Sequence, residues 1–512
     1  MVAVPIATNV QESRAPSPVP PVTIIPPCTA AIPTYGTECA AKTIDEYDAQ
    51  DPTVAALVLK DGTVMQGYSF GAETKSISGE CVFQTGMVGY PESLTDPSYR
   101  GQILVLTYPL IGNYGVPSHD VIDPILKDLP AYFESNQIHI AGLVVGQASA
   151  EFSHHLAKTS LGDWLRREGV PAIYGVDTRA ITKRIREEGV MLGKILLPTS
   201  VVGGSGSSAG DEVSAVLSDY QDVAWVDPNA TNLVAEVSCK EPRLYLPPTA
   251  DETPLLKRPD GKTVRIVAVD IGMKYNQIRC FVKRGVEVLV VPWDYDFLGE
   301  TNIDGLFLSN GPGDPTTLTV TIERVQKALV LQKYPIFGIC LGHQVLALAS
   351  GAQTEKMKYG NRGQNIPCTD MLTSRCYITS QNHGYAVKAE TLPPNVKELF
   401  VNANDGSNEG IYHTDKPYFS VQFHPESNPG PRDTEVLFDI FLSTVTRCLE
   451  SGVQGPVEFP GTEAAQARRQ QLEQWERDLD SDNLDKTGRI VKGRRIRKVL
   501  VLGSGGLSIG QA

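Results

Sequence analysis

Short apolar runs alternate with longer amphipathic stretches in the second half of the chain. Four runs have the length and near-continuous hydrophobicity of strands buried on both faces, at 265–270, 286–292, 305–309 and 336–339. Helical periodicity fills the stretches between them, as at 276–284 and 320–332. Strands that alternate with helices predict a largely parallel sheet with right-handed crossovers. We therefore expect an α/β domain over residues 263–447.

The carboxyl-terminal part of this domain has a different pattern. Three shorter segments look like strands of hairpins, at 374–380, 409–413 and 418–426, and an amphipathic helix at 434–449 closes the domain. Antiparallel strands appended to a parallel sheet are common in α/β proteins. The fold class predicted here is therefore α/β, with a largely parallel central sheet.

An earlier, mixed α/β domain is expected over residues 51–200. Its strand-like runs and helical stretches are at 55–59, 64–68, 102–108, 140–145, 161–168 and 179–188. The turn Lys60-Asp61-Gly62-Thr63 joins the first two strands as a hairpin. A polar, glycine-dotted and aromatic stretch at 79–99 is unlike a simple connector. About 150 residues is within the usual size of a domain.

The remaining segments are predicted to connect or flank these domains. Residues 1–50 are rich in proline and hold no hydrophobic period, so we expect a disordered tail. Residues 201–262 form an insertion and a linker, with a Gly- and Ser-rich stretch at 202–210. Residues 448–497 are a charged linker, and residues 498–512 start a strand and a glycine-rich turn that looks like the truncated start of a further domain.

Composition narrows the class of protein. The chain has 512 residues, 41% hydrophobic and 21% charged, as in soluble globular proteins, and its net charge of −13 argues against nucleic-acid or anionic-membrane partners. No apolar run approaches the roughly 20 residues of a membrane-spanning helix, and no signal layout opens the chain. The nine cysteines form no C-x-x-C pair and the eight histidines show no metal spacing. We expect reduced thiols, a cytoplasmic location and no metal site.

One cysteine has the surroundings of a nucleophile. The pattern Gly338-x-Cys340-x-Gly342 follows a short apolar run and precedes a helical one, as in a nucleophile elbow with cysteine in place of serine. Both glycines are expected because a Cβ would clash in the tight turn. The turn exposes Sγ at the end of the strand and places it at a helix N-terminus, where the dipole favours the thiolate. A buried structural cysteine is the alternative interpretation.

A base and a group that orients it follow later in the chain. His424 and Glu426 are two residues apart in an apparent strand, so their side chains are expected on the same face with Cα atoms roughly 7 Å apart. Such a strand beside the elbow would present imidazole to Cys340 and carboxylate to imidazole, which is a Cys-His-Glu triad. Taken singly, the histidine could be a packed core residue and the glutamate a solvated loop residue.

Acyl transfer also needs donors for an oxyanion. The sequence Asn310-Gly311-Pro312-Gly313 follows a predicted parallel strand at its carboxyl end, where sites of α/β proteins form. We expect the backbone N–H groups of Gly313 and Leu341 to be the oxyanion donors. The alternative is an ordinary Gly-Pro-Gly turn.

Together these motifs resemble known enzymes. The stretches at 310–315, 338–344 and 424–426, in this order, resemble class I glutamine amidotransferases. The stretches at 83–90, 94–99 and 111–115 resemble the small-subunit domain of carbamoyl-phosphate synthetase, and 501–512 looks like the opening of its synthetase part. Their fusion in one chain is similar to the multifunctional pyrimidine-pathway proteins, most of all the fungal ones, in which carbamoyl-phosphate synthetase is joined to aspartate transcarbamoylase.

The resemblance implies hydrolysis of glutamine, with ammonia passed to a synthetase part of the same longer chain. It implies no cofactor in this chain, but ATP and Mg²⁺ for the ATP-grasp synthetase part that begins at 498–512. A transcarbamoylase part is a further implied partner. The implied glutamine-binding residues are Ser98, Gly311, Gly313, Leu341, Gln344, Asn382, Gly384 and Tyr385. Ser98 comes from the first domain, so the site is expected at the domain boundary.

Three other interpretations remain open from the sequence. The chain could be the small subunit of an arginine-pathway carbamoyl-phosphate synthetase, although the residues from Val499 onward count against this. It could be a catalytically silent docking module, against which the presence of Cys340 and both partners argues. It could also be another cysteine hydrolase, but these usually place the acid before the histidine.

Overall fold

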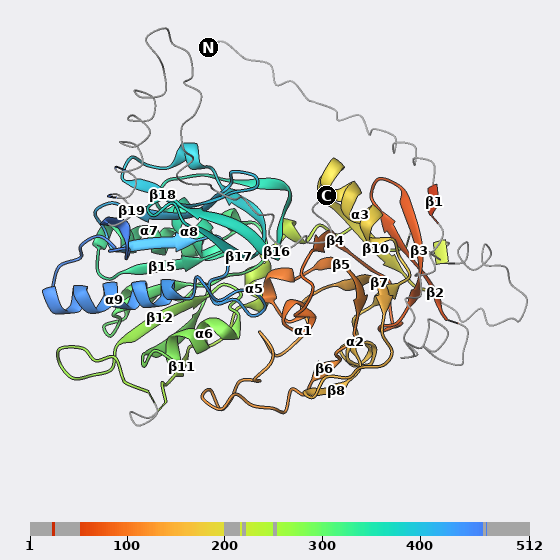
Figure 1. The fold of residues 1–512 in the computed structure, drawn as a ribbon, viewed down its shortest axis with the longest axis horizontal. Coiled ribbons are helices and arrows are strands. Elements are labelled where there is room, and N and C mark those ends of the chain that lie inside the picture. Colours follow the sequence, from red (N-terminus) through yellow and green to blue (C-terminus); the bar gives the residue numbers. More distant parts are fainter. Residues whose placement is uncertain are drawn as a thin grey trace, which may run out of the picture.

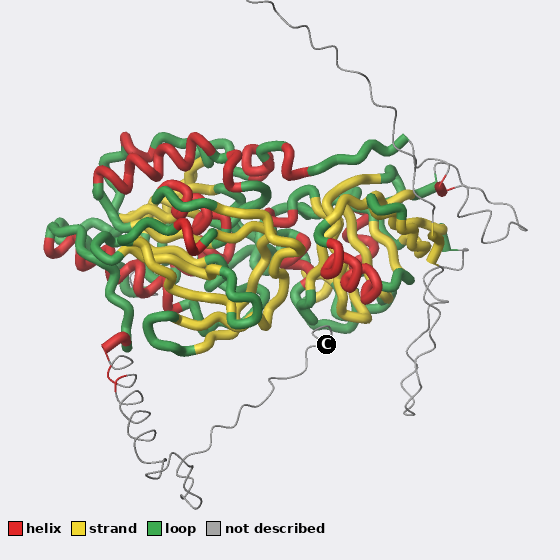
Figure 2. Tube along the Cα trace, turned by 90° about the horizontal axis from the view of Figure 1, so that it is seen from above, coloured by secondary structure: helices red, strands yellow, loops and turns green. Residues whose placement is uncertain are grey.

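The computed structural model describes residues 52–198, 222–248 and 253–463, together with the short segments 23–25, 216–217, 467 and 470. Two halves lie side by side, the amino-terminal half in red to yellow and the carboxyl-terminal half in green to blue (Figure 1). Each half has its own sheet with helices packed on it, and the view from above shows the two halves in contact (Figure 2). The expected pair of α/β domains is therefore present.

An eight-stranded sheet forms the amino-terminal half, in the order β1-β3-β2-β10-β4-β5-β7-β9. Strand β9 also pairs with β3, so the sheet closes on itself. The parallel strands β4, β5 and β7 lie at its centre. These strands are β1 (Thr23–Ile25), β2 (Val54–Leu59), β3 (Thr63–Ser69), β4 (Ile77–Gln84), β5 (Gln102–Ile111), β7 (Gly142–Ala148), β9 (Ala172–Tyr174) and β10 (Met191–Leu196).

Short helices complete this half. They are α1 (Tyr90–Leu94), the 3₁₀ helix η2 (Pro97–Tyr99), α2 (Leu161–Arg167) and α3 (Thr178–Glu188), and a two-stranded ribbon joins β6 (Val116–Pro117) to β8 (Ala157–Thr159). The predicted hairpin and both longer helices are confirmed. Strand β4 was not predicted, because Gly79 and Glu80 interrupt its apolar run. A Cβ on Gly79 would lie 2.4 Å from the carbonyl oxygen of Gly101, so close strand packing requires this glycine.

A ten-stranded sheet forms the carboxyl-terminal half, in the order β11-β13-β12-β14-β15-β20-β19-β18-β16-β17. Its five central strands, from β13 to β20, run parallel, as the alternation of strands and helices predicts. The strands are β11 (Arg243–Tyr245), β12 (Arg265–Asp270), β13 (Glu287–Pro292), β14 (Gly305–Leu308), β15 (Ile336–Ile339), β16 (Thr354–Asp370), β17 (Cys376–Val387), β18 (Val396–Asn402), β19 (Asn408–His413) and β20 (Tyr418–Val421).

Helices cover both faces of this sheet. The helices are α5 (Leu233–Val237), α6 (Tyr275–Val282), α7 (Thr319–Leu331), α8 (Leu341–Ala349) and α9 (Val436–Ser451). Side chains of β12 alternate between two core clusters, Ile266 packing with α6 and α9 and Val267 with α7 and α8. This arrangement explains the continuous apolar run of a strand that is buried on both faces.

Segments predicted to be connectors contain ordered structure. Within the range 201–262, helix α5 packs Val234 into the core and β11 adds an antiparallel edge strand next to β13. Within the range 448–497, Val457 is buried in the core. Strand β1 lies in the segment predicted as a tail, and it pairs with β3. The pairings of β1 with β3 and of β11 with β13 join segments that are distant in sequence. The local sequence of β1 and β11 therefore did not reveal them.

The other expectations for these segments lie outside the described residues. They concern the rest of the tail at 1–50, the Gly- and Ser-rich stretch at 202–210, most of 448–497 and the start of a further domain at 498–512. Within the described residues, none of the helices has the length and apolar character that crossing a membrane requires.

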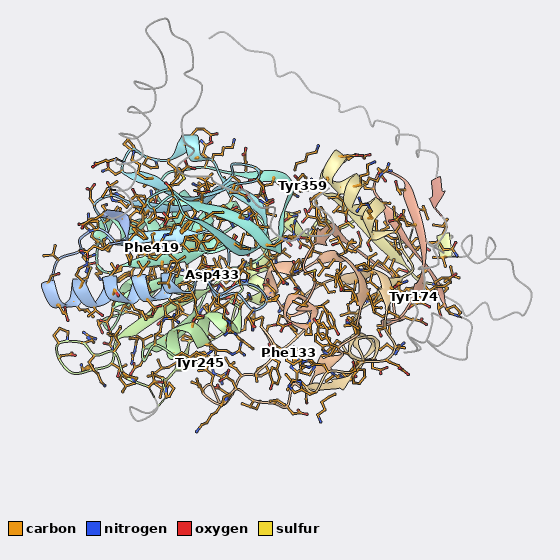
Figure 3. The ribbon with its side chains drawn as sticks, in the orientation of Figure 1. Phe133, Tyr174, Tyr245, Tyr359, Phe419 and Asp433 are labelled. Atoms are coloured by element: carbon orange, nitrogen blue, oxygen red, sulfur yellow. The ribbon has the colours of Figure 1, made fainter. Side chains whose placement is uncertain are left out.

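Buried charges and aromatic rings join the two halves. Arg279 of α6 lies 2.8 Å from Asp123 and 3.6 Å from Glu134, and all three side chains are buried. Tyr359 of β16 packs against the core of the amino-terminal half, with its ring 6.2 Å from that of Phe83 (Figure 3). An interface with buried ion pairs is expected to hold the halves in one relative position.

Loss of the buried cation at this interface should destabilise the protein. In Arg279→Met, the carboxylates of Asp123 and Glu134 lose their buried partner, and the free energy of unfolding should fall by about 3 kcal/mol. Arg243→Met is the matched control, because Arg243 also pairs across the interface, with Asp128, but both side chains are about half exposed (52% and 47%). Its effect should stay below about 1 kcal/mol.

Urea denaturation followed by circular dichroism measures both variants. Equal losses of stability in Arg279→Met and Arg243→Met would contradict the importance assigned here to burial of the Arg279 ion pairs.

Candidate active site

Cys340 stands between a strand and a helix, as the sequence predicts. It follows β15 directly and precedes α8, with φ of +54°, a conformation that non-glycine residues rarely adopt. A Cβ on Gly338 would lie 2.7 Å from the carbonyl oxygen of Gly342, and one on Gly342 would lie 2.2 Å from that of Leu308. The turn therefore requires both glycines, and the predicted tight turn from strand to helix at Cys340 is confirmed.

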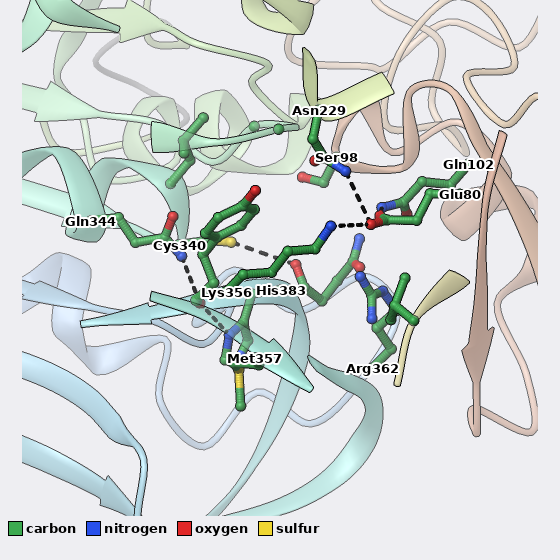
Figure 4. A pocket seen from close by; sticks show the side chains of 17 residues that line it. Glu80, Ser98, Gln102, Asn229, Cys340, Gln344, Lys356, Met357, Arg362 and His383 are labelled. Carbon is green, nitrogen blue, oxygen red and sulfur yellow. Dashed lines mark hydrogen bonds and ion pairs between the residues drawn. The ribbon is translucent and has the colours of Figure 1, made fainter. Parts of the chain in front are cut away.

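The thiol of Cys340 is buried but faces a pocket. Its side chain is 2% exposed, and Sγ lies 3.6 Å from the backbone carbonyl oxygen of Asn382 as a hydrogen-bond donor. Cys340 lines a cavity together with polar residues from both halves (Figure 4). Cys340 thus belongs to the apolar core cluster on one side and borders a polar pocket on the other.

His424 and Glu426 lie next to each other beyond the carboxyl end of β20. Nδ1 of His424 is 2.7 Å from Oε1 of Glu426, and both side chains are buried. The expectation that they alternate along one strand is wrong, because β20 ends at Val421. The chain turns instead, with the N–H of Ser427 donating to the carbonyl oxygen of His424 at 3.0 Å. This turn still brings the imidazole and the carboxylate together.

The His424–Glu426 pair favours its charged form in spite of burial. Burial lowers the pKa of His424, but the Glu426 carboxylate and Cys340 outweigh it, so that the pKa is raised overall. Burial raises the pKa of Glu426, but His424 and Lys274 outweigh it and hold this pKa below its usual range. Lys274 Nζ lies 3.4 Å from Oε1 of Glu426, and Gln277 Nε2 donates to the same atom at 3.2 Å.

One nitrogen of His424 remains for the thiol. Nδ1 of His424 is the ring nitrogen that contacts Glu426. Nε2 is buried, and within the described part of the chain it has no hydrogen-bond partner. Cys340 is also one of the groups that raise the pKa of this imidazole. An imidazole oriented by a carboxylate and facing a thiol is the arrangement of a thiol nucleophile with its base.

The pocket contains the residues that the resemblance implied for glutamine. It lies at the boundary between the halves, as expected for a site to which Ser98 contributes. Ser98, Gly311, Gly313, Leu341, Gln344, Asn382, Gly384 and Tyr385 line this pocket together with Cys340. Their role in binding glutamine stays a prediction.

The two predicted oxyanion donors lie in the same pocket. Gly313 follows β14 with φ of +86°, and Leu341 is the first residue of α8, where helices leave their N–H groups without a partner in the helix. A Cβ on Gly311 would lie 1.7 Å from the carbonyl oxygen of Ile271, so this glycine lets the turn approach β12 closely. The Gly-Pro-Gly sequence is therefore more than an ordinary surface turn.

Sequence reasoning missed a polar group at the rim of the pocket. Oε1 of Glu80 accepts hydrogen bonds from Lys356 Nζ at 2.7 Å and Asn229 Nδ2 at 3.0 Å, and Oε2 accepts one from Gln102 Nε2 at 2.9 Å (Figure 4). These residues come from β4, β16, β5 and the segment before α5. A glutamate inside an apolar strand is a signal that its carboxylate has partners, but it does not say which.

Comparison with known proteins agrees with this division of the chain. Residues 57–195 match the model of the carbamoyl-phosphate synthase small chain, CPSase domain, and residues 267–444 match that of the class-I glutamine amidotransferases. The arginine-specific small chain of carbamoyl phosphate synthase from Yarrowia lipolytica is 49% identical over 417 residues, which cover 80% of this chain and 87% of that protein. The chain belongs to the carbamoyl-phosphate synthase small chain family.

Longer relatives of this small chain are still more similar in sequence. Multifunctional protein pyr-3 of Neurospora crassa is 59% identical and multifunctional protein URA2 of Saccharomyces cerevisiae is 58% identical, over 91% and 90% of the present chain. The chain spans 24% and 20% of the length of these proteins. Membership of this family confirms the resemblance and excludes an unrelated cysteine hydrolase.

Neutralising the carboxylate of Glu426 should change the titration of the His424 imidazole. In Glu426→Gln, a group that favours the imidazolium is lost while burial, which disfavours it, remains. The pKa of His424 should therefore fall, and its NMR titration midpoint should move to lower pH. Selective ¹³C labelling of histidine measures this midpoint, with His424→Gln to assign the signal.

Glu187→Gln is the control, because Glu187 is an exposed residue of α3. An unchanged midpoint in Glu426→Gln would mean that the carboxylate does not set the charge of the imidazole.

Proposed function

We propose that this chain hydrolyses glutamine to glutamate and ammonia with Cys340, His424 and Glu426 as its catalytic residues. The observation that carries the proposal is the 2.7 Å contact between Nδ1 of His424 and Oε1 of Glu426, beside a cysteine in a strained elbow. This contact fixes the ring so that Nε2 is the basic atom. The match to class-I glutamine amidotransferases supports the same assignment.

The first half of the reaction forms a thioester. The proton of Sγ passes to Nε2 of His424, whose surroundings favour the imidazolium, and the thiolate attacks the side-chain amide carbon of glutamine. The N–H groups of Gly313 and Leu341 donate to the oxyanion of the tetrahedral intermediate. The imidazolium then gives its proton to the amide nitrogen, the C–N bond breaks, and ammonia leaves.

Water completes the reaction. Nε2 of His424 takes a proton from a water molecule, which attacks the glutamyl thioester, and the same two N–H groups stabilise the second oxyanion. The C–S bond breaks, the thiol recovers its proton, and glutamate is released. Glu426 keeps its charge throughout and stabilises the imidazolium in both steps.

The pocket offers suitable partners to the charged end of glutamine. Gln344 uses its Nε2 to donate to the carbonyl oxygen of Tyr385 at 2.9 Å and to Oε1 of Gln422 at 3.0 Å, which leaves its own Oε1 as an acceptor for the α-ammonium group. Ser98 Oγ accepts from Asn310 Nδ2 at 2.9 Å, so its hydroxyl proton can be donated to the α-carboxylate. Such partners discriminate against amides that lack the zwitterion.

The ammonia is proposed to serve carbamoyl-phosphate synthesis in the cytoplasm. A synthetase part of a longer chain would use it with bicarbonate, ATP and Mg²⁺, at the first step of pyrimidine formation, and a transcarbamoylase part would follow. The higher identities to multifunctional proteins, 54–59% for the fungal ones, support this over an arginine-pathway small subunit, whose named relatives are 49% and 50% identical. Cofactors belong, in this proposal, to the synthetase part alone.

Replacement of the nucleophile should abolish ammonia release. Cys340→Ser keeps the size of the side chain but offers a far weaker nucleophile, so kcat for glutamine hydrolysis should fall roughly 10³-fold or more. A coupled glutamate dehydrogenase assay measures the ammonia. Cys376→Ser, at an exposed cysteine of β17, is the control and should keep the wild-type rate.

Ammonia release that persists in Cys340→Ser would overturn the assignment of the nucleophile. If the wild-type chain alone releases no ammonia, addition of the synthetase part in trans separates an incomplete site from a docking module without activity.

Removal of the Ser98 hydroxyl should weaken glutamine binding more than catalysis. Ser98→Ala deletes a hydrogen bond to a charged group, worth about 1.5 kcal/mol, so KM should rise about tenfold with a smaller change in kcat. Ser93→Ala is the matched control, since Ser93 is a buried serine of the same half that bonds to Gln84 at 3.0 Å. A normal KM in Ser98→Ala would place the α-carboxylate elsewhere in the pocket.

A further inference from the structure

Asp96 of the amino-terminal half reaches into the active site of the other half. It is the N-cap of the 3₁₀ helix η2, where its Oδ1 accepts a hydrogen bond from the N–H of Ser98 at 2.9 Å. Only 5% of the residue is exposed. This cap fixes the carboxylate in one orientation, with its second oxygen pointing away from its own helix.

Two amide side chains from across the interface donate to this carboxylate. Asn310 Nδ2 lies 3.3 Å from Oδ1 of Asp96, and Asn382 Nδ2 lies 3.2 Å from Oδ2. Among the described residues, no Lys, Arg or His side chain forms an ion pair with Asp96 within 4.0 Å. A buried carboxylate without an ion pair depends on such donors for its stability.

Each of these asparagines is connected to a different part of the proposed catalytic site. Asn382 supplies, through its backbone carbonyl, the oxygen that lies 3.6 Å from Sγ of Cys340. Asn310 directly precedes the turn Gly311-Pro312-Gly313, and its Oδ1 accepts from the N–H of Lys274 at 3.1 Å. The carboxylate of Asp96 therefore connects the residue that contacts the thiol with the turn that carries a proposed oxyanion donor.

We propose that Asp96 is a positioning residue for the glutaminase site, a role that rests on the function proposed above. Through Asn382 it holds the thiol of Cys340 beside Nε2 of His424, and through Asn310 it holds the turn that carries the N–H of Gly313. The amidotransferase half thus attains its active geometry only while the amino-terminal half is docked on it. Asp96 touches neither the substrate nor the reacting atoms.

A carboxylate is required here because every neighbour is a donor. Asp96 accepts from one backbone N–H and two amide N–H groups, and an ionised carboxylate offers acceptors only. An asparagine at this position can keep its Oδ1 towards Ser98 and Asn310, but its NH₂ then faces the NH₂ of Asn382. The substitution Asp96→Asn therefore keeps the shape, removes the negative charge that also acts on Lys274, and reverses one hydrogen-bonding group.

The first experiment compares Asp96→Asn with the wild type in two assays. The kcat for ammonia release should fall at least roughly tenfold with a smaller change in KM, because small displacements of catalytic groups are costly. Alkylation of Cys340 by iodoacetamide, measured on its peptide by mass spectrometry, should slow to a similar extent, because a displaced thiol loses its base. The second assay needs no glutamine and no turnover.

A matched control isolates the effect of the cap. Asp296 caps another three-residue 3₁₀ helix, Phe297–Gly299, by accepting from the N–H of Leu298 at 3.3 Å, and it is exposed. Asp296→Asn should leave kcat and the alkylation rate within about twofold of the wild type, as surface changes usually do. Thermal unfolding shows whether each variant is folded.

A polarity swap tests the contact itself. In the double variant Asp96→Asn with Asn382→Asp, the amide donates to the carboxylate, so the hydrogen bond is restored in the opposite direction. The alkylation rate should recover relative to Asp96→Asn alone. If Asp96→Asn does not fold, Asn382→Ala removes the same contact from the other side of the interface and should slow alkylation in the same way.

Two results would overturn the proposal. One is an alkylation rate and kcat in Asp96→Asn within twofold of the wild type. The other is an equal loss in Asp296→Asn, which would show a general effect of lost caps. A wild-type chain that releases no ammonia would count against the proposed function instead, and the alkylation rates would still decide the role of Asp96.

Discussion

The site depends on the close packing of backbone segments around the turn at Cys340. Gly342 approaches the carbonyl oxygen of Leu308 so closely that a Cβ would stand 2.2 Å away, and Gly338 approaches Gly342 in the same manner. Strand β14, strand β15 and helix α8 are thereby locked together around one turn. This packing over-determines the conformation of Cys340, so the residue can hold a strained φ of +54°.

The parallel order of the strands explains why Gly311, Gly313 and His424 lie at the same end of the sheet as Cys340. Strand β15 lies between β14 and β20, all three run in the same direction, and their carboxyl ends meet at one edge. Gly311 and Gly313 follow β14, Cys340 follows β15, and His424 follows β20 after a turn. Sites of α/β sheets form at this edge for the same topological reason.

Sequence patterns predicted those parts of the site that short motifs specify. The glycines around Cys340 and the spacing of His424 and Glu426 are local, and so they could be read before the fold was known. The rim around Glu80 and the bonds of Asp96 were not predicted, because their partners come from distant segments and no spacing connects them. The strands β4, β1 and β11 were missed for a related reason, since pairing with neighbours stabilises strands that local propensity does not favour.

The charges around the His424–Glu426 pair come from both halves of the protein. Lys274 stabilises the carboxylate of Glu426 at 3.4 Å, yet burial alone would lower the pKa of this lysine. Glu426, Glu134 and Asp96 together raise it, and two of these three carboxylates come from the amino-terminal half. Separation of the halves would leave Lys274 with fewer counter-charges and Glu426 with a less stable cation. The charge state of the His424–Glu426 pair and the placement of the thiol therefore depend on the same docked arrangement.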